Sequence, residues 1–208
     1  MKPEVLKLEQ RKIFEKLKNF PDFYLAGGTG LALQINHRRS FDFDLFRKKE
    51  FDEFFISKIC RVFKGKKIRF SLRHSEQINL TVNSTNLSFV KYPYFLIFPL
   101  NKIKGVSIAS PKEIALMKSF TLGRRASLKD YVDLYFIFKN KIINLKEILK
   151  LGEKKYGKEF NGRLFLEELT YLEDINEVPE EKIEFLGEKV ARSEMKKFFE
   201  KEIKKIKL

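Results

Sequence analysis

Two aspartates separated by a single residue follow a glycine-rich turn in the first quarter of the chain. The turn is Gly27-Gly28-Thr29, and the aspartates are Asp42 and Asp44. Side chains at positions i and i+2 of a strand point to one face, about 6–7 Å apart. Two carboxylates that close repel each other unless a cation neutralises them, and Mg²⁺ prefers carboxylate, phosphate and water oxygens. The pair therefore predicts a magnesium site with Asp42 and Asp44 as ligands.

The glycine turn supplies the complementary half of a nucleotide site. Gly27 and Gly28 leave room for phosphate to approach backbone N–H groups, and a helix expected from Thr29 to Asn36 adds a favourable dipole. Turn and aspartates together predict a site that binds a nucleoside triphosphate with Mg²⁺ and carries out two-metal phosphoryl transfer. Taken alone, each motif is more typical of an ordinary turn or a solvated strand face. Their order and proximity favour the site.

Three polar residues lie between the turn and the aspartates. Arg38 and Arg39 are candidates to contact phosphate or to neutralise the aspartate pair, and a solvated surface position is an equal alternative. Ser40 is either a phosphate ligand or a structural residue. Arg39 and Ser40 are included with the glycine turn as candidate nucleotide-binding residues.

Further candidates come from the second half of the chain. Lys118 stands on an otherwise apolar helix face, where a lysine either extends to solvent or meets an anion such as a phosphate. Asp130 and Asp133 are three positions apart and share one helix face. They are candidate catalytic acids, while the alternatives are a helix-start acid for Asp130 and, for Asp133, an internal salt bridge to Lys129 or Arg125.

Periodicity and turn signals predict a mixed αβ region up to about residue 110. Cys60 falls on the apolar face of a predicted helix and is expected in the core. Helices are expected over 3–19, 29–36 and 52–63, and strands over 23–26, 42–46, 67–73, 78–83, 87–92 and 105–109.

The chain changes character after Ser110, and the remainder is predicted to be helical. Ser110, Pro111 and Glu113 form a capping-box helix start. Helices are expected over 110–122, 128–138, 145–156, 164–172 and 180–206. The sequence thus predicts an αβ core in residues 1–110 and a helical C-terminal part in residues 111–208 that packs on the core and completes the site.

The net charge of +15 is unevenly distributed over the 208 residues. Residues 150–208 hold 14 basic and 14 acidic residues, whereas residues 1–149 hold 29 basic and 14 acidic ones. That excess favours polyphosphate and nucleic acid as partners, and a lysine-rich surface is the plainer alternative. The single cysteine and the N-terminus without a signal-peptide pattern predict a cytoplasmic protein, and no apolar run is long enough to cross a membrane.

Several sequence blocks, in this order, resemble the AbiEii/AbiGii family of toxin-type nucleotidyltransferases, within the superfamily related to DNA polymerase β. The resemblance covers the first two-thirds of the chain. The blocks are Gly27-Gly28-Thr29-x-Leu31-Ala32-Leu33, Arg39-Ser40-x-Asp42-x-Asp44-Leu45-Phe46, Phe89-Val90-Lys91-Tyr92-Pro93-Tyr94, and Ala115-Leu116-Met117-Lys118 followed by Lys129-Asp130-Tyr131-x-Asp133-Leu134-Tyr135.

The resemblance implies an α+β fold, with a nucleotidyltransferase-like mixed β-sheet core, flanking helices and a helical C-terminal part. It implies Mg²⁺-dependent transfer of a nucleotide from an NTP to an acceptor hydroxyl. It suggests RNA, specifically the 3′ end of tRNA, as acceptor, and the toxin-type role in a type IV toxin–antitoxin system with a cognate antitoxin as partner. It also points to Lys118 and to the segment of Asp130 and Asp133 as its last two motifs.

One departure from the superfamily pattern concerns the third carboxylate. Those enzymes usually take it from a later core strand, whereas here Ser88 stands near that position and no acid occurs between Glu76 and Glu113. The third acid is then Asp130 or Asp133, or the site uses two acids. The alternatives to an RNA-directed enzyme are a catalytically weak or inactive nucleotide- or RNA-binding protein and an enzyme that nucleotidylates a protein partner.

Overall fold

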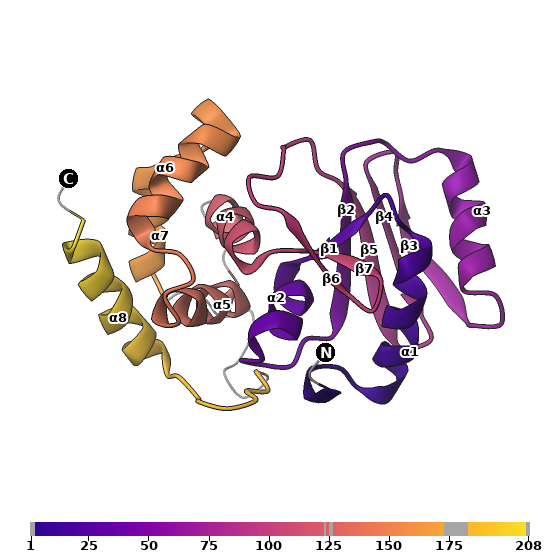
Figure 1. Cartoon of the computed structure of the whole chain (residues 1–208), viewed down its shortest axis with the longest axis horizontal. Coiled ribbons are helices and arrows are strands. Elements are labelled where there is room, and N and C mark those ends of the chain that lie inside the picture. The colour runs from indigo at the N-terminus through magenta and orange to yellow at the C-terminus, as the bar shows by residue number, and fades with distance from the viewer. Residues whose placement is uncertain (1–2, 123, 125–126, 173–182, 207–208) are drawn as a thin grey trace.

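A mixed β-sheet forms the first half of the protein in a computed structural model that describes residues 3–122, 124, 127–172 and 183–206 (Figure 1). Within these residues the sheet has seven strands in the order β3-β4-β5-β2-β1-β7-β6. The strands are β1 (Tyr24–Ala26), β2 (Asp42–Arg47), β3 (Ile68–Arg73), β4 (Gln77–Val82), β5 (Thr85–Lys91), β6 (Leu100–Ile103) and β7 (Val106–Ala109).

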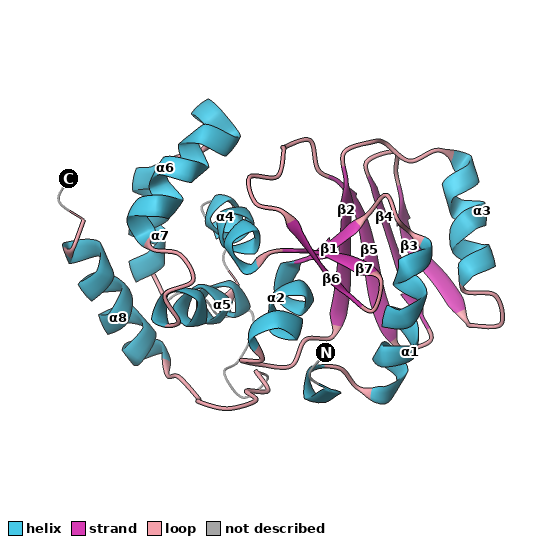
Figure 2. Cartoon of the chain, viewed as in Figure 1, coloured by secondary structure: helices cyan, strands magenta, loops and turns pink. Residues whose placement is uncertain are grey.

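Helices flank the sheet, and the described C-terminal part consists of helices joined by loops (Figure 2). They are α1 (Leu8–Lys16), α2 (Gly27–Ile35), α3 (Glu53–Val62), α4 (Pro111–Leu122), α5 (Leu128–Lys139), α6 (Leu145–Tyr156), α7 (Gly162–Thr170) and α8 (Arg192–Lys204). The predicted α+β fold with a mixed sheet is confirmed. No helix in the described ranges is long and apolar enough to cross a membrane.

Strand β2 positions the aspartates because its side chains alternate between the two faces of the sheet. It pairs antiparallel with β1 and parallel with β5. Phe43 and Leu45 are buried in a cluster with α1 and α3, where the rings of Phe14 and Phe43 lie 6.1 Å apart. Asp42 and Asp44 therefore share the opposite face, as the alternating sequence predicts.

A second apolar cluster joins the helices to the other side of the sheet. It includes Ala26 and Ala109 from the strands, Leu116 from α4 and Tyr131 from α5, and it extends to Phe199 on α8. Helices α4 and α5 thus pack firmly beside the polar face of β2, and this packing is what brings their charged residues near the aspartates.

The structure corrects two of the predicted elements. Helix α8 begins at Arg192, whereas a helix was expected from residue 180; residues 180–182 lie outside the described ranges, and residues 183–191 are not helical. Phe185 forms a backbone bridge with Arg38, so tertiary pairing overrides the local helical pattern there. Strand β6 was not predicted, because its four residues are mostly exposed and lack alternation.

Two side chains also differ from expectation. Cys60 is exposed, because the buried positions of α3 are Phe55 and Ile59. The capping box at Ser110 is half formed: the Glu113 N–H donates to Ser110 Oγ at 3.3 Å. The Glu113 carboxylate instead accepts from the amides of the loop that follows β5 and pairs with Lys155. A buried lysine is a stronger partner than the free helix-start amide.

Candidate active site

A cleft of about 580 Å³ lies between the polar face of the sheet and helices α4 and α5. It brings together most of the residues that the sequence singled out. Its lining includes Gly27, Gly28, Ser40, Asp42, Asp44, Lys118 and Asp130. These residues come from α2, the loop after it, β2, α4 and α5, so the sheet and the helical part both contribute walls.

The aspartate wall is the end of β2 that enters the cleft. Asp42 is exposed and Asp44 is half-buried, and Asn86 Nδ2 donates to Asp42 Oδ1 at 3.0 Å. Ser88 lies opposite Asp44 in the register of β2 and β5 and lines the same cleft. Within the described ranges, no three His, Cys, Asp or Glu side chains are grouped to hold a metal, so the site offers two strand carboxylates and a hydroxyl.

The glycine turn allows two side chains to lie against the start of α2. Gly27 has φ of +62°, and a Cβ there would lie 2.6 Å from Asp44 Oδ2. A Cβ at Gly28 would overlap the Arg38 guanidinium. Side chains at these positions would displace Asp44 and Arg38 from the first turn of α2, whose N–H groups and dipole favour an anion.

Thr29 and Ser40 tie this turn to the aspartate strand. Their hydroxyl oxygens are 2.7 Å apart, and Thr29 Oγ1 also donates to the main-chain carbonyl of Asp42. Thr29 is 1% exposed and does not line the cleft, whereas Ser40 does. Thr29 is therefore placed to fix the position of Asp42, and Ser40 is the hydroxyl that faces a ligand.

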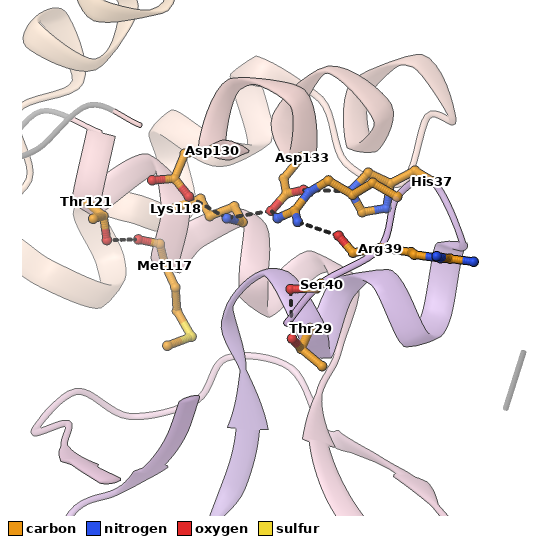
Figure 3. A network of polar contacts seen from close by, with 10 residues as sticks. Thr29, His37, Arg39, Ser40, Met117, Lys118, Thr121, Asp130 and Asp133 are labelled. Atoms are coloured by element: carbon orange, nitrogen blue, oxygen red, sulfur yellow. Dashed lines mark hydrogen bonds and ion pairs between the residues drawn. The ribbon is translucent and has the colours of Figure 1, made fainter. Parts of the chain in front are cut away.

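Lys118 on α4 forms the cationic part of the opposite wall (Figure 3). Its Nζ lies 2.5 Å from Asp130 Oδ1 and 2.7 Å from Asp133 Oδ2. Burial lowers the pKa of Lys118, but the two carboxylates outweigh burial and raise that pKa above its ordinary value. Lys118 is consequently a fixed cation that lines the cleft beside Asp130.

Asp133 lies behind this wall, fully buried, and does not line the cleft. Arg38 donates from Nε to Oδ1 at 2.7 Å and from Nη2 to Oδ2 at 2.9 Å, and His37 Nε2 is 2.6 Å from Oδ1. Burial raises the pKa of Asp133, but the charges of Arg38 and Lys118 outweigh it and hold that pKa well below its usual range. The carboxylate is thus occupied by three basic side chains, which suits it to position the cleft walls.

Arg39 lies outside the cleft, in contrast to its neighbour Arg38. Its Nη1 is 2.9 Å from Glu184 Oε2 and its Nε donates to the carbonyl of Glu4 at 3.1 Å. Figure 3 shows this side chain directed away from Lys118 and Asp130. Arg38 is the arginine that lines the cleft, whereas Arg39, which the sequence analysis included among the candidate nucleotide-binding residues, does not line it.

The other end of the cleft is apolar, and sequence reasoning did not identify it. Phe46, Val90, Ile114 and Met117 line it, with Tyr92 beside them. The Tyr92 hydroxyl is 2.7 Å from that of Tyr156, and burial raises the pKa of Tyr92. An apolar end beside a charged end suits a ligand with a flat ring and a phosphate chain.

A mixed sheet with paired aspartates on one strand, a helix start beside them and a flanking helical part defines a nucleotidyltransferase-type fold. A sequence model described as "Nucleotidyl transferase AbiEii toxin, Type IV TA system" matches residues 11–207. The chain therefore belongs to the AbiEii family of nucleotidyl transferase toxins, and it is a nucleotidyltransferase.

One related sequence and two solved structures resemble the chain over most of its length. The uncharacterized protein aq_aa25 of Aquifex aeolicus (strain VF5) is 35% identical over 206 residues, which is 96% of each chain. JHP933 from Helicobacter pylori is 17% identical with a TM-score of 0.55, covering 96% of this chain and 95% of that one. MenT4, a nucleotidyltransferase toxin from Mycobacterium tuberculosis H37Rv, is 16% identical with a TM-score of 0.55, covering 90% and 80%. The two solved structures show a shared fold.

Proposed function

We propose that the protein is a Mg²⁺-dependent enzyme that transfers a nucleotide from an NTP to a hydroxyl of RNA, with the 3′ end of tRNA as acceptor, as the toxin-type component of a type IV toxin–antitoxin system. The observation that carries this proposal is the single cleft in which Asp42 and Asp44 meet the start of α2 on one side and Lys118 with Asp130 on the other. These groups supply what a triphosphate with a divalent cation requires: carboxylates for the cation, and N–H groups and a lysine for the phosphates.

The fit of Mg²⁺ rests on the donor set. Asp42 and Asp44 present carboxylates to one face beside the glycine turn, and Mg²⁺ takes one or two carboxylates together with phosphate oxygens and water. When bound, the ion neutralises the triphosphate and activates the attacking hydroxyl. Asp130 is the further acid lining the cleft, so it is the candidate for the role that a third strand carboxylate has in the wider superfamily.

The remaining side chains have separate tasks in binding. The first turn of α2, Ser40 and Arg38 contact the phosphate chain, and Lys118 stabilises the charge that develops on the leaving pyrophosphate. The acceptor oxygen forms a bond to the α-phosphorus as the bond to pyrophosphate breaks, and the hydroxyl proton passes to solvent water. Asp133 holds Arg38 and Lys118 in place for this step. The base occupies the apolar end near Met117.

The charge distribution supports nucleic acid as the acceptor. Residues 1–149, which contain the sheet and the cleft, hold 29 basic and 14 acidic residues. Such an excess attracts polyanions and speeds their encounter with the site. It attracts RNA more strongly than an acceptor protein of ordinary composition.

The test is label transfer from NTPs carrying a labelled α-phosphate. With Mg²⁺ and total tRNA, label is expected in RNA for at least one NTP, and none in EDTA. Periodate oxidation of the tRNA destroys its terminal diol and is expected to abolish the reaction. Label found in protein and not in RNA would show that the acceptor is a protein. NTP binding without transfer to either RNA or protein would overturn the proposal of nucleotide transfer.

A further inference from the structure

Four side chains form a straight row across the polar face of the sheet, starting at the candidate metal site. The strand registers pair Asp42 with Asn86, Asn86 with Thr81, and Thr81 with Arg69. Paired residues of neighbouring strands point to the same face, so the row runs from β2 across β5 and β4 to β3. At about 4.8 Å per strand it extends about 14 Å from Asp42.

The side chains of the row are linked by hydrogen bonds near the cleft, whereas the last one, at the sheet edge, is exposed to solvent. Asn86 donates to Asp42 at 3.0 Å, and Thr81 Oγ1 donates to Asn86 Oδ1 at 3.1 Å. Arg69 is exposed, and its side chain makes no hydrogen bond, ion pair or ring contact with any residue that the structure describes. The apolar helix layer of α1 and α3 packs on the opposite face, against Leu80 and its neighbours. This face therefore presents hydrogen-bonding groups and one unpaired cation to solvent.

The stretch of sequence that contains these strands is strongly basic. Between Glu53 and Glu113 the chain has eleven lysines and arginines and a single acid, Glu76. The Glu76 carboxylate is already paired with Lys91 at 2.7 Å. Strands β3, β4 and β5 themselves contain no Asp or Glu, so the carboxylates on this face of the sheet belong to Asp42 and Asp44 on β2.

A second row next to the first is polar except at its β3 end. Asp44, Ser88 and Asn79 are in register, and Leu72 ends the row on β3. The two rows contain hydroxyls, amides and a guanidinium and no aromatic ring. Such groups contact phosphates and sugars, whereas base recognition on a sheet uses stacked aromatic side chains.

We propose that the outward face of β3, β4 and β5, defined by Arg69, Asn79, Thr81 and Asn86, binds the sugar-phosphate backbone of a single-stranded RNA acceptor. The identification of the acceptor rests on the proposed function. The terminal hydroxyl lies at Asp42, and the preceding backbone crosses the face towards Arg69. Because the face lacks aromatic rings, binding on it depends weakly on base sequence and strongly on salt.

The test measures binding of a short fluorescein-labelled single-stranded RNA to the full chain, in EDTA and without NTP, so that catalysis plays no part. Arg69→Ala is expected to weaken binding about fivefold and to reduce the slope of log affinity against log salt by about 0.7. Thr81→Glu places a negative charge in the middle of the face and is expected to weaken binding more.

Arg73→Ala is the matched control. Arg73 is exposed on the same strand but lies over the Phe70 ring at 4.2 Å, and its register partner Ile78 faces the α3 layer. This variant is expected to keep both affinity and slope. Equal effects of Arg69→Ala and Arg73→Ala, or no RNA binding by the unmodified chain, would overturn the proposal.

Activity separates this proposal from the proposed function. If the protein transfers nucleotide to tRNA and Arg69→Ala does not change the apparent KM for tRNA, the binding face is rejected but the proposed function is retained. The expected pattern in RNA binding, without nucleotide transfer to any acceptor, would reject the function while the binding face stands. Thermal melting of each variant checks that its fold is retained.

Discussion

Two pairs of aspartates contribute to opposite walls of the cleft, and they differ in what surrounds them. Asp42 on the strand is exposed, accepts from the neutral amide of Asn86, and forms no ion pair with any residue in the described ranges. Asp133 on the helix is fully buried and meets Lys118, Arg38 and His37. In each pair the two aspartates lie on the same face of their strand or helix. The protein's own basic side chains neutralise the pair on α5, whereas Asp42 on β2 is open to the cleft.

The difference indicates separate roles. A buried carboxylate is stable only when cations and hydrogen bonds offset the loss of hydration, so Asp133 with its three partners holds α4, α5 and the loop after α2 together. An exposed carboxylate next to a second one gains from an external cation. The strand pair is therefore suited to bind metal, and the helix pair to position the residues around it.

The largest expected effect follows neutralisation of the strand pair. Asp42→Asn and Asp44→Asn each remove a proposed metal ligand, so nucleotide transfer is expected to fall about a thousandfold or more, measured as label incorporated at saturating NTP and Mg²⁺. The melting temperature of Asp42→Asn is expected to stay the same or rise, because repulsion between the carboxylates is relieved. If both variants transfer nucleotide at the original rate, Asp42 and Asp44 do not have the metal-binding role that separates them from Asp130 and Asp133.

Removal of the charge at Asp133 is expected to act on stability first. Asp133→Asn leaves Arg38 and Lys118 buried without their shared counterion, a change that costs about 3–5 kcal/mol in the free energy of unfolding. Urea unfolding at neutral pH measures it. Asp130→Asn is the matched control: it lines the cleft and Lys118 keeps Asp133, so its cost is expected to be the smaller of the two. Equal costs would contradict the separate roles.

Local patterns in the sequence predicted the parts of the site that depend on neighbouring residues. The alternation of Asp42, Phe43, Asp44 and Leu45 defined which face of β2 carries the acids, and helix α6 has the predicted bounds. A strand or helix face follows from periodicity within a few residues. The glycine turn was likewise recognisable before the fold was known.

The partners across the cleft were beyond such patterns. Asp133 bonds to Arg38 and His37, which lie 95 and 96 positions earlier in the chain, and sequence reasoning considered Lys129 or Arg125 instead. The choice depends on how α5 packs against the loop after α2. The non-helical segment 183–191, which pairs with that same loop through Phe185, was missed for the same reason.

The smallest expected effect is a pH dependence that originates at His37. The imidazole is buried against the Phe136 ring, with Asp133, Arg38 and Lys118 as the charged groups around it, and burial lowers the pKa of His37 despite the bond to Asp133. The folded state then binds fewer protons than the unfolded state, whose histidine titrates near pH 6.5. Stability is therefore expected to fall as pH drops below about 6.5, by at most about 1.4 kcal/mol per pH unit.

Urea midpoints between about pH 7.5 and about pH 5.5 isolate this contribution, because the stabilisation from the lowered pKa of Asp133 is lost only below about pH 3.9. His37→Gln keeps an N–H donor for Asp133 and removes the titration, so it is expected to flatten the dependence while retaining most of the stability at neutral pH. An unchanged pH dependence in His37→Gln would show that the network around Asp133 does not sense protons in this range. If the stability of His37→Gln does not change with pH in this range, the acid sensitivity originates at the network around the buried Asp133, where the protein supplies its own cations. It does not then originate at Asp42 and Asp44, which face the cleft.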